Sequence, residues 1–283
     1  MIRIKVHTLF LLAILTIVPA NSEAQNNGFG KISWEKEKIQ PGLIWKHTQT
    51  VFEDTLLQNI NILIVNTRKR DLSVQYDHAK NAKVSTQVGG TGAIAAVNGG
   101  FFSIANGGSV TYIRTGGLIV DSDTATKWKK NVNLNGAILI SPDGEVTIMK
   151  AMTNQWFDSH TEYPYVLVTG PLLIENNALA TLPETSLITT RHPRTAIGKS
   201  GKRKVMIITV DGRTDQSAGL TLHELSGLMN DLNCSDAVNL DGGGSTTMWI
   251  SGKPFDGVVN MPCDNRKFDH EGARAVSNII VVK

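Results

Sequence analysis

Residues 239–247 read Asn-Leu-Asp-Gly-Gly-Gly-Ser-Thr-Thr, and they constrain this chain more than any other segment. The residues from Asp236 onward alternate between apolar and polar side chains, which predicts a short strand that ends near Asp241. The three glycines that follow can adopt a positive φ and carry no Cβ, so a ligand can approach the backbone. Consecutive N–H groups and hydroxyl side chains together form a concave anion site. The segment therefore predicts a carboxylate beside a bound anion, with a glycine-rich turn and a solvated Asp241 as the simpler alternative.

Three other segments repeat this design of an apolar run beside a polar residue and glycine. They contain Asn98, Asp211 and, in a weaker form, Arg194. One such segment alone is better explained as a turn. Because the ends of neighbouring strands can converge on one pocket, we expect all four segments to share a site.

Arginine and carboxylate side chains would supply the chemistry of this site. Arg194 and Arg213 are expected to hold a phosphate through paired N–H donors, and a surface ion pair is the alternative for both. Asp241, Asp211 and Glu224 are candidate catalytic groups, because two carboxylates at a suitable separation divide into an acid and a base or nucleophile. A capping box that starts at Thr221 explains Glu224 equally well.

Other candidates would bind the substrate through amides, hydroxyls or rings. Phe102 is expected to stack on a sugar face, with core packing as the alternative. His223 is a candidate proton carrier or phosphate donor, although a solvated helical histidine is the more common case. The remaining binding candidates offer small polar side chains or accessible amides: Asn98, Gly99, Gly242, Gly243, Gly244, Ser245 and Thr246.

The element pattern predicts one α+β domain with a mostly antiparallel or mixed β-sheet and few helices. Strands are expected around residues 32–65, 72–76, 93–97, 110–149, 165–174, 195–198, 205–210 and 275–282. One clear helix follows Thr221, a short one is expected near residues 84–89, and residues 154–165 are expected to form a loop.

The first 24 residues have the pattern of a signal peptide. Arg3 and Lys5 precede an apolar stretch that is too short for a comfortable membrane span, and a small-x-small motif ends at Ala24. We therefore expect cleavage near Ala24 and export, with a bacterial periplasm as the destination. Residues 25–80 carry no distinctive motif and are expected to belong to the same domain as residues 81–283. The formal net charge of +3 is too small to suggest nucleic-acid binding.

Cys234 and Cys263 are expected to form a disulfide in an oxidising compartment, which would brace the glycine-rich segment between them. Two free thiols are the alternative. No EF-hand spacing is present, and no cofactor is required by the sequence, but Asp and Asn oxygens leave a divalent cation possible.

Six segments, spread in order over residues 90–283, together resemble the phosphodiester glycosidase family: residues 96–103, 194–198, 210–213, 219–225, 239–248 and 274–281. The resemblance implies hydrolysis of a sugar-1-phosphodiester at the glycosidic C1–O bond, with a phosphorylated glycan as partner and a bacterial glycan or exopolysaccharide as its source. Two other functions stay open. One is a glycan-binding protein without turnover, and the other is a metal-dependent phosphodiesterase that cuts the P–O bond.

Overall fold

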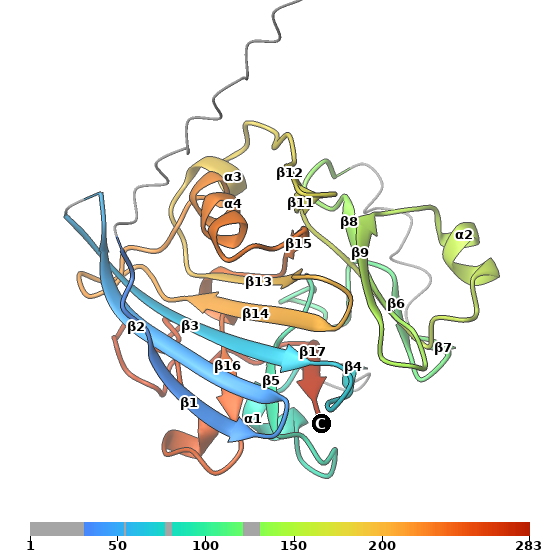
Figure 1. Ribbon diagram of the computed structural model, residues 1–283, viewed down its shortest axis with the longest axis horizontal. Coiled ribbons are helices and arrows are strands. Elements are labelled where there is room, and N and C mark those ends of the chain that lie inside the picture. The colour runs from blue at the N-terminus through green and yellow to red at the C-terminus, as the bar shows by residue number, and fades with distance from the viewer. Residues whose placement is uncertain (1–30, 54, 77–80, 121–130) are drawn as a thin grey trace, which may run out of the picture.

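The computed structural model of the protein describes residues 31–53, 55–76, 81–120 and 131–283. The predicted signal peptide lies outside these residues. Three antiparallel sheets make up most of the fold, and short helices pack at their edges and faces (Figure 1). This arrangement confirms the predicted α+β class with mostly antiparallel pairing.

The largest sheet has eight strands in the order β1-β2-β3-β14-β13-β15-β11-β12. Side chains on its central strands alternate between two apolar layers, as the period of two in a strand requires. In β14, Val205 and Ile207 face one buried cluster, whereas Met206 and Ile208 face the other. The bounds are β1 (Glu35–Gln40), β2 (Leu43–Phe52), β3 (Leu56–Asn66), β14 (Lys204–Val210), β13 (Arg194–Lys199), β15 (Asp236–Asn239), β11 (Leu172–Glu175) and β12 (Ala178–Leu179).

Two smaller sheets share the first of these apolar layers with the large sheet. The four-stranded sheet has the order β16-β5-β17-β4, and the five-stranded sheet has the order β7-β6-β10-β8-β9. Their bounds are β16 (Met248–Ile250), β5 (Ala95–Asn98), β17 (Asn278–Val282), β4 (Leu72–Tyr76), β7 (Leu118–Ile119), β6 (Ile113–Thr115), β10 (Tyr165–Thr169), β8 (Gly136–Ile140) and β9 (Val146–Lys150).

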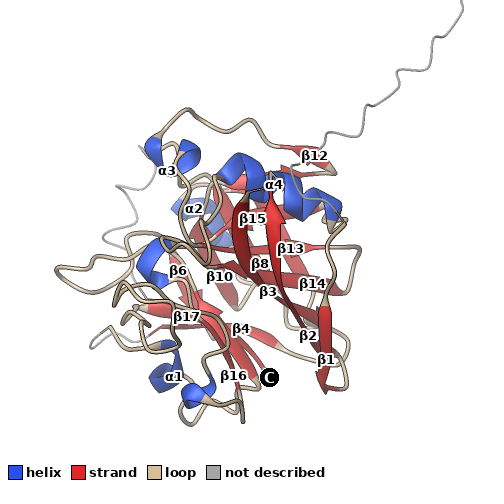
Figure 2. Cartoon of the chain, turned by 90° about the vertical axis from the view of Figure 1, so that its left-hand side faces the viewer, coloured by secondary structure: helices blue, strands red, loops and turns tan. Residues whose placement is uncertain are grey.

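Helices α3 (Ser186–Thr189) and α4 (Leu222–Asp231) cover the second apolar layer of the large sheet (Figure 2). Helix α4 forms where the sequence predicts it, because the Thr221 hydroxyl accepts from the Glu224 N–H and the Glu224 carboxylate accepts from the Thr221 N–H. The other helical elements are α1 (Val84–Gln87), α2 (Asn154–Ser159) and two 3₁₀ turns, η3 (Gly243–Ser245) and η4 (Phe255–Gly257).

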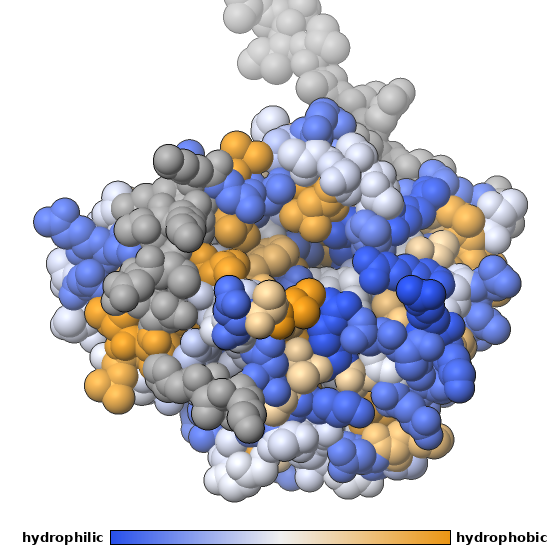
Figure 3. Space-filling view, turned by 180° about the vertical axis from the view of Figure 1, so that it is seen from behind, coloured by the Kyte–Doolittle hydropathy of each residue, from blue (hydrophilic) through white to orange (hydrophobic). Residues whose placement is uncertain are grey.

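Two local predictions are wrong. Residues 154–159 form helix α2 instead of a loop, because Thr153 caps the N–H of Trp156 and Phe157 is fully buried. The segment 165–174 is not one bent strand: the chain turns at Gly170 and Pro171, so β10 and β11 belong to different sheets. Viewed from behind, the surface is mostly polar, with apolar residues scattered among the polar ones (Figure 3).

Candidate functional site

The antiparallel pairing of β13 with β14 and β15 brings three of the predicted segments together where these central strands begin or end. This end of the strands is one edge of the large sheet. Arg194, the first residue of β13, pairs with Val210, the last residue of β14. Ala196 pairs with Asn239 at the end of β15. Asp211 and Asp241 therefore leave their strands at the same edge at which β13 begins, and the predicted convergence is confirmed for these segments.

Asn98, the last residue of β5, ties the fourth segment to this edge. Its Nδ2 donates to the main-chain oxygen of Asp241 at 2.6 Å, and its Oδ1 accepts from Thr195 Oγ1 at 2.8 Å and from the Thr247 N–H at 3.1 Å. Only 1% of Asn98 is exposed. The side chain therefore positions the glycine loop and has no free polar atom for the sugar hydroxyl that the sequence suggested.

The close packing next to Asn98 requires glycine at position 99. A Cβ at this position would lie 2.1 Å from Asn278 Oδ1, and the Gly99 N–H donates to the Asn278 carbonyl at 2.9 Å. The Gly99 carbonyl in turn accepts from the Asp241 N–H at 3.0 Å. Gly99 thus supports the backbone of Asp241, and its own N–H and carbonyl both form hydrogen bonds within the protein.

Asp241 is a half-buried residue that follows β15 at this end of the sheet. Burial of the group raises its pKa from the ordinary 3.8 to about 6. The Ser245 hydroxyl and the Gly242 N–H, which donates to Oδ1 at 3.0 Å, favour the ionised form and oppose this shift, as does the charge of Arg274. The Ser245 hydroxyl lies near the carboxylate without forming a well-oriented hydrogen bond. Asp241 consequently changes its charge close to neutral pH, as a catalytic carboxylate does.

The glycine loop does not form the predicted cradle of amides. The Gly242 N–H donates to Asp241 itself, and the Gly243 N–H donates to the Pro193 carbonyl at 2.8 Å. Two of the three amides are therefore already used. The hydroxyls of Ser245 and Thr246 are fully buried and have no hydrogen-bond partner among the described residues, so they also lie out of reach of a ligand in this conformation.

Arg213 and the ion pair of Arg274 with Asp264 occupy the space that the glycines leave. A Cβ on Gly243 would lie 2.9 Å from Arg213 Nη2. A Cβ on Gly244 would meet Asp264 Oδ1 first and would lie 2.5 Å from Arg274 Nη2. Arg213 is exposed, and 27% of the Arg274 side chain is exposed while it pairs with Asp264. The glycines thus allow two cations to approach the loop beside Asp241, which is an arrangement that binds phosphate well.

Arg213 has a strained backbone at this position. Its φ of 66° lies in the left-handed region, which costs a non-glycine residue free energy and often marks a functional site. Its Nη2 lies 3.3 Å from His192 Nδ1. Burial, with the charges of Arg194 and Arg213, lowers the pKa of His192 and so favours the neutral form of this ring.

Arg194 does not have the predicted role of a phosphate ligand. Its Nε donates to the Leu220 carbonyl, and its Nη2 donates to the carbonyls of Leu187 and Thr190, at 2.7 to 2.8 Å. Only 1% of the residue is exposed. Arg194 instead joins β13 to α3 and to the segment that precedes α4, because buried carbonyls need donors.

Glu224 is also occupied by structural contacts. Its carboxylate closes the capping box of α4 and pairs with Arg191, and 14% of the side chain is exposed. The alternative explanation from the sequence, a capping box, is therefore confirmed, and the placement gives no support to a catalytic role.

Asp211 is buried to 99% and accepts from Asn59 Nδ2 at 2.6 Å, from Asn260 Nδ2 at 2.7 Å and from the Met261 N–H at 2.9 Å. Burial raises its pKa, and these three donors oppose the shift. Asn260 also donates to the Thr246 carbonyl at 3.1 Å. Asp211 therefore fixes the segment that faces the glycine loop and does not itself reach solvent.

Two candidate binding residues, Phe102 and His223, do not lie beside the glycine loop. The Phe102 ring packs against a buried cluster that contains Val276 and Ile279, as the core-packing alternative expected. His223 is half exposed on α4 and lies 3.5 Å from Glu184, so it has an exposed ion-pair partner away from the glycine loop.

The predicted disulfide is wrong. Cys234 and Cys263 are both buried free thiols. Cys234 packs with Met229 in the layer under α4, whereas Cys263 lies beside Arg213. Their side chains belong to different surroundings, so the glycine loop is held by hydrogen bonds and not by a covalent bridge.

The described residues contain no group of three or more His, Cys, Asp or Glu side chains that could hold a metal ion. None of the helices in the described ranges is long and apolar enough to cross a membrane. A hollow of about 470 Å³ lies at the opposite end of β14 and does not include the residues around Asp241.

Arg274, Asn260 and Asn278 contact these segments but were not among the candidate site residues. Arg274 and Asn278 lie in the segment 274–281 that resembles the family, and this was the signal that could have identified them. Asn260 would have been found only by asking which buried amides can bridge chain segments.

Comparison with known proteins identifies one matching family and several distant relatives. The model of the Phosphodiester glycosidase family matches residues 91–283. N-acetylglucosamine-1-phosphodiester alpha-N-acetylglucosaminidase of Bos taurus is 27% identical over 202 residues, which cover 66% of this chain and 36% of that protein. The SPbeta prophage-derived uncharacterized protein YomE of Bacillus subtilis (strain 168) is 38% identical over 82 residues, covering 27% of this chain and 13% of that protein. This chain thus spans about a third or less of the length of these relatives.

Two solved structures share the fold. The catalytic domain of the zebrafish N-acetylglucosamine-1-phosphodiester alpha-N-acetylglucosaminidase, auto-inhibited by its pro-peptide, has a TM-score of 0.69 and 19% identity and covers 89% of both chains. A hypothetical protein from Synechocystis has a TM-score of 0.70 and 14% identity and covers 89% of this chain and 64% of that one.

Proposed function

Because the chain belongs to the phosphodiester glycosidase family, we propose that it hydrolyses the glycosidic C1–O bond of a sugar-1-phosphodiester. The observation that carries this proposal is the placement of Arg213 and Arg274 against Gly243 and Gly244, next to the half-buried residue Asp241 with its raised pKa. A phosphodiester is an anion joined to a sugar carbon, so it needs cations on one side of the broken bond and a carboxylate on the other.

The two arginines would bind the phosphate. Arg213 is exposed and Arg274 is partly exposed, so a ligand reaches both without rearrangement of the sheets. The guanidinium of Arg274 is oriented by Asp264, which leaves less conformational entropy to lose on binding. Stabilising the leaving phosphate lowers the barrier, because negative charge develops on its bridging oxygen as the C1–O bond breaks.

Asp241 would act on the sugar side in its ionised form. The electron pair of the breaking bond leaves with the phosphate, and positive charge develops at C1. Asp241 can stabilise this charge or take a proton from the water whose oxygen bonds to C1. The products are a free sugar and a phosphomonoester, and a good phosphate leaving group reduces the need for a separate general acid.

A panel of sugar-1-phosphodiesters, with chromatographic detection of free sugar and phosphomonoester, tests this proposal. We expect the wild type to turn over at least one substrate. Asp241→Asn should lower kcat/KM at least about a hundredfold, whereas the control Asp215→Asn, at an exposed position, should keep the wild-type kcat/KM. Saturable saccharide binding without any product would instead indicate a binding protein.

The remaining parts of the proposal concern the source of the substrate. The signal-peptide pattern of residues 1–24 supports export, and an exported enzyme would meet a glycan or glycoconjugate outside the cytoplasm. A mature N-terminus near Gln25, measured on the secreted protein, would support this location. Retention of the first 24 residues would contradict it.

A further inference from the structure

A basic hollow lies at the end of the large sheet opposite to Asp211. It has a volume of about 470 Å³, which is within the range of ligand sites (about 300–1,000 Å³). Lys204 at the start of β14 lines it, whereas Val210 at the end of β14 precedes Asp211. At about 3.3 Å per residue, the two ends of this strand are about 20 Å apart. The hollow is therefore a site separate from the glycine loop.

The floor of the hollow is an uncovered part of a sheet face. Ile44 pairs with Ile64, and Asn66 pairs with Lys204, so these four side chains share one face. Further along the same face, residues such as Ile62 are buried in the layer beneath α3 and α4. Those short helices do not extend to Ile64 and Asn66, which leaves a partly apolar floor open at this end.

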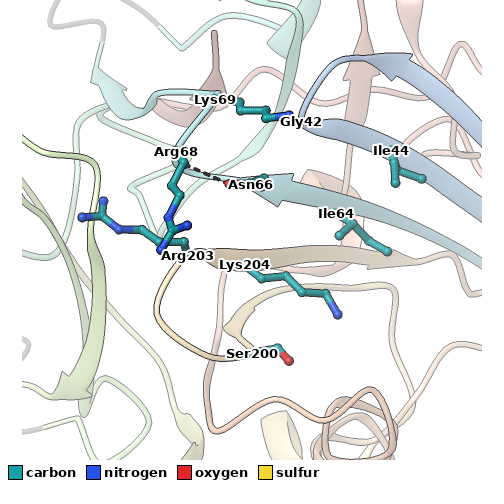
Figure 4. Close-up of a pocket in the computed structure, with 9 residues that line it drawn as sticks. All are labelled: Gly42, Ile44, Ile64, Asn66, Arg68, Lys69, Ser200, Arg203 and Lys204. Carbon is teal, nitrogen blue, oxygen red and sulfur yellow. Dashed lines mark hydrogen bonds between the residues drawn. The ribbon is translucent and has the colours of Figure 1, made fainter.

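The rim of the hollow is cationic. Arg68, Lys69, Arg203 and Lys204 line it together (Figure 4). Arg203 is oriented by Asp143, whose carbonyl and carboxylate accept from its guanidinium at 2.6 and 2.5 Å. No carboxylate of the described residues pairs with Arg68, Lys69 or Lys204, and the nearby Glu145 pairs with Lys202. Figure 4 shows the side chain of Arg68 directed toward Arg203, whose own guanidinium extends away toward its partner Asp143.

We propose that this hollow binds an acidic polysaccharide, as a second saccharide site that does not catalyse turnover. Phosphate or carboxylate groups of the chain would contact Arg68 and Lys204. The aliphatic floor of Ile44 and Ile64 fits the apolar face of a sugar ring, and the Ser200 hydroxyl and the Asn66 amide can bond sugar hydroxyls. Single-stranded nucleic acid fits less well, because its binding sites use aromatic rings for base stacking and the lining contains none.

Affinity electrophoresis tests this proposal on the mature protein. The gels contain polygalacturonate or phosphorylated dextran, and neutral dextran serves as the uncharged control. We expect both acidic polymers to retard the wild type, with retardation that weakens as salt is added. The double variant Arg68→Glu/Lys204→Glu should bind about tenfold more weakly.

The matched control is Lys36→Glu/Lys267→Glu, which changes the net charge by the same amount at exposed positions outside the hollow. It should bind like the wild type. The neutral variant Arg68→Gln/Lys204→Gln should lose part of the binding, and thermal unfolding verifies that all variants are folded. Equal weakening by the hollow and control variants, or equal retardation by neutral dextran, would overturn the proposal.

The outcome is independent of the proposed hydrolysis. Asp241→Asn should bind the acidic polymers like the wild type, and the hollow variants should hydrolyse a small sugar-1-phosphodiester like the wild type. If hydrolysis fails while binding persists, only the catalytic proposal is lost. If binding fails while hydrolysis persists, only the second site is lost.

Discussion

Asn98 Nδ2 donates a 2.6 Å hydrogen bond to the main-chain oxygen of Asp241, and this bond joins the four-stranded sheet to the edge of the eight-stranded sheet. The two residues are 143 positions apart in the chain. The position of the carboxylate therefore depends on a side chain from a different sheet, which also accepts from Thr195 and Thr247.

Replacing Asn98 by Ala should lower both stability and activity. The change leaves the part-buried Asp241 carbonyl and the buried Thr247 N–H without their partner, and a buried unsatisfied group costs about 1–3 kcal/mol. Thermal unfolding and kcat/KM measure the two effects. Asn106→Ala, at an exposed position, is the control and should behave like the wild type. Wild-type stability and activity in Asn98→Ala would contradict the role of this bond.

The pH dependence of activity should follow Asp241. Burial raises its pKa to about 6, and the ionised form is the active one in the proposed mechanism. We therefore expect kcat/KM to be constant above about pH 7 and to fall about tenfold per unit below pH 6. A profile that instead falls as pH rises through 6 would assign the active role to the protonated acid.

The same shift makes a prediction about stability. A carboxyl group whose pKa is raised in the folded state binds its proton more tightly there than in the unfolded chain. Its contribution to folding is thus most favourable at low pH and is lost as pH rises from about 4 through 6. Asp241→Asn should consequently unfold a few degrees higher than the wild type at pH 7.5 and show little gain at pH 4. A lower unfolding temperature at pH 7.5 would indicate that the charge of Asp241 is stabilised in the fold.

Arg213 and Arg274 should act on substrate binding more than on folding. Truncating either to Ala removes a charged hydrogen bond worth about 1.5–3 kcal/mol, so kcat/KM should fall by roughly 10- to 100-fold. Arg213→Ala keeps a Cβ at the same positive φ, so it adds no backbone strain, and Arg213→Lys keeps the charge without the paired donors. Lys267→Ala is the control for loss of a nearby exposed charge. Activity that is insensitive to both arginine changes would exclude them as phosphate ligands.

Glu224→Gln should separate a structural carboxylate from a catalytic one. Gln can still accept from the Thr221 N–H, while the ion pair with Arg191 is lost. We expect a stability loss of about 0.5–1.5 kcal/mol with kcat/KM near the wild-type value. A loss of a hundredfold or more in kcat without a comparable loss of stability would restore Glu224 as a catalytic group.

Local signals made part of this structure predictable. The capping box of Thr221 and Glu224 and the hairpin of β13 and β14 depend on neighbouring residues, and both form as expected. The convergence of the Asn98, Asp211 and Asp241 segments could be predicted because each polar residue follows a buried strand.

The roles of the arginines could not be predicted in the same way. Arg194, Arg213 and Arg274 carry the same group, but tertiary packing buries the first under three carbonyls and leaves the other two at the surface. The use of the Gly242 and Gly243 amides within the protein is likewise set by Asp241 and Pro193 after folding. A sequence motif shows which hydrogen-bond donors are present. Whether a donor is free to bind a ligand is known only when the folded structure shows which donors already bind other groups of the protein.

The most direct measurement of the central claim is hydrolysis of a sugar-1-phosphodiester in H₂¹⁸O, with mass analysis of both products. We predict that ¹⁸O appears in the free sugar and is absent from the phosphomonoester, and that Asp241→Asn abolishes this product formation. Appearance of ¹⁸O in the phosphomonoester would show P–O cleavage and contradict the proposed hydrolysis of the glycosidic C1–O bond.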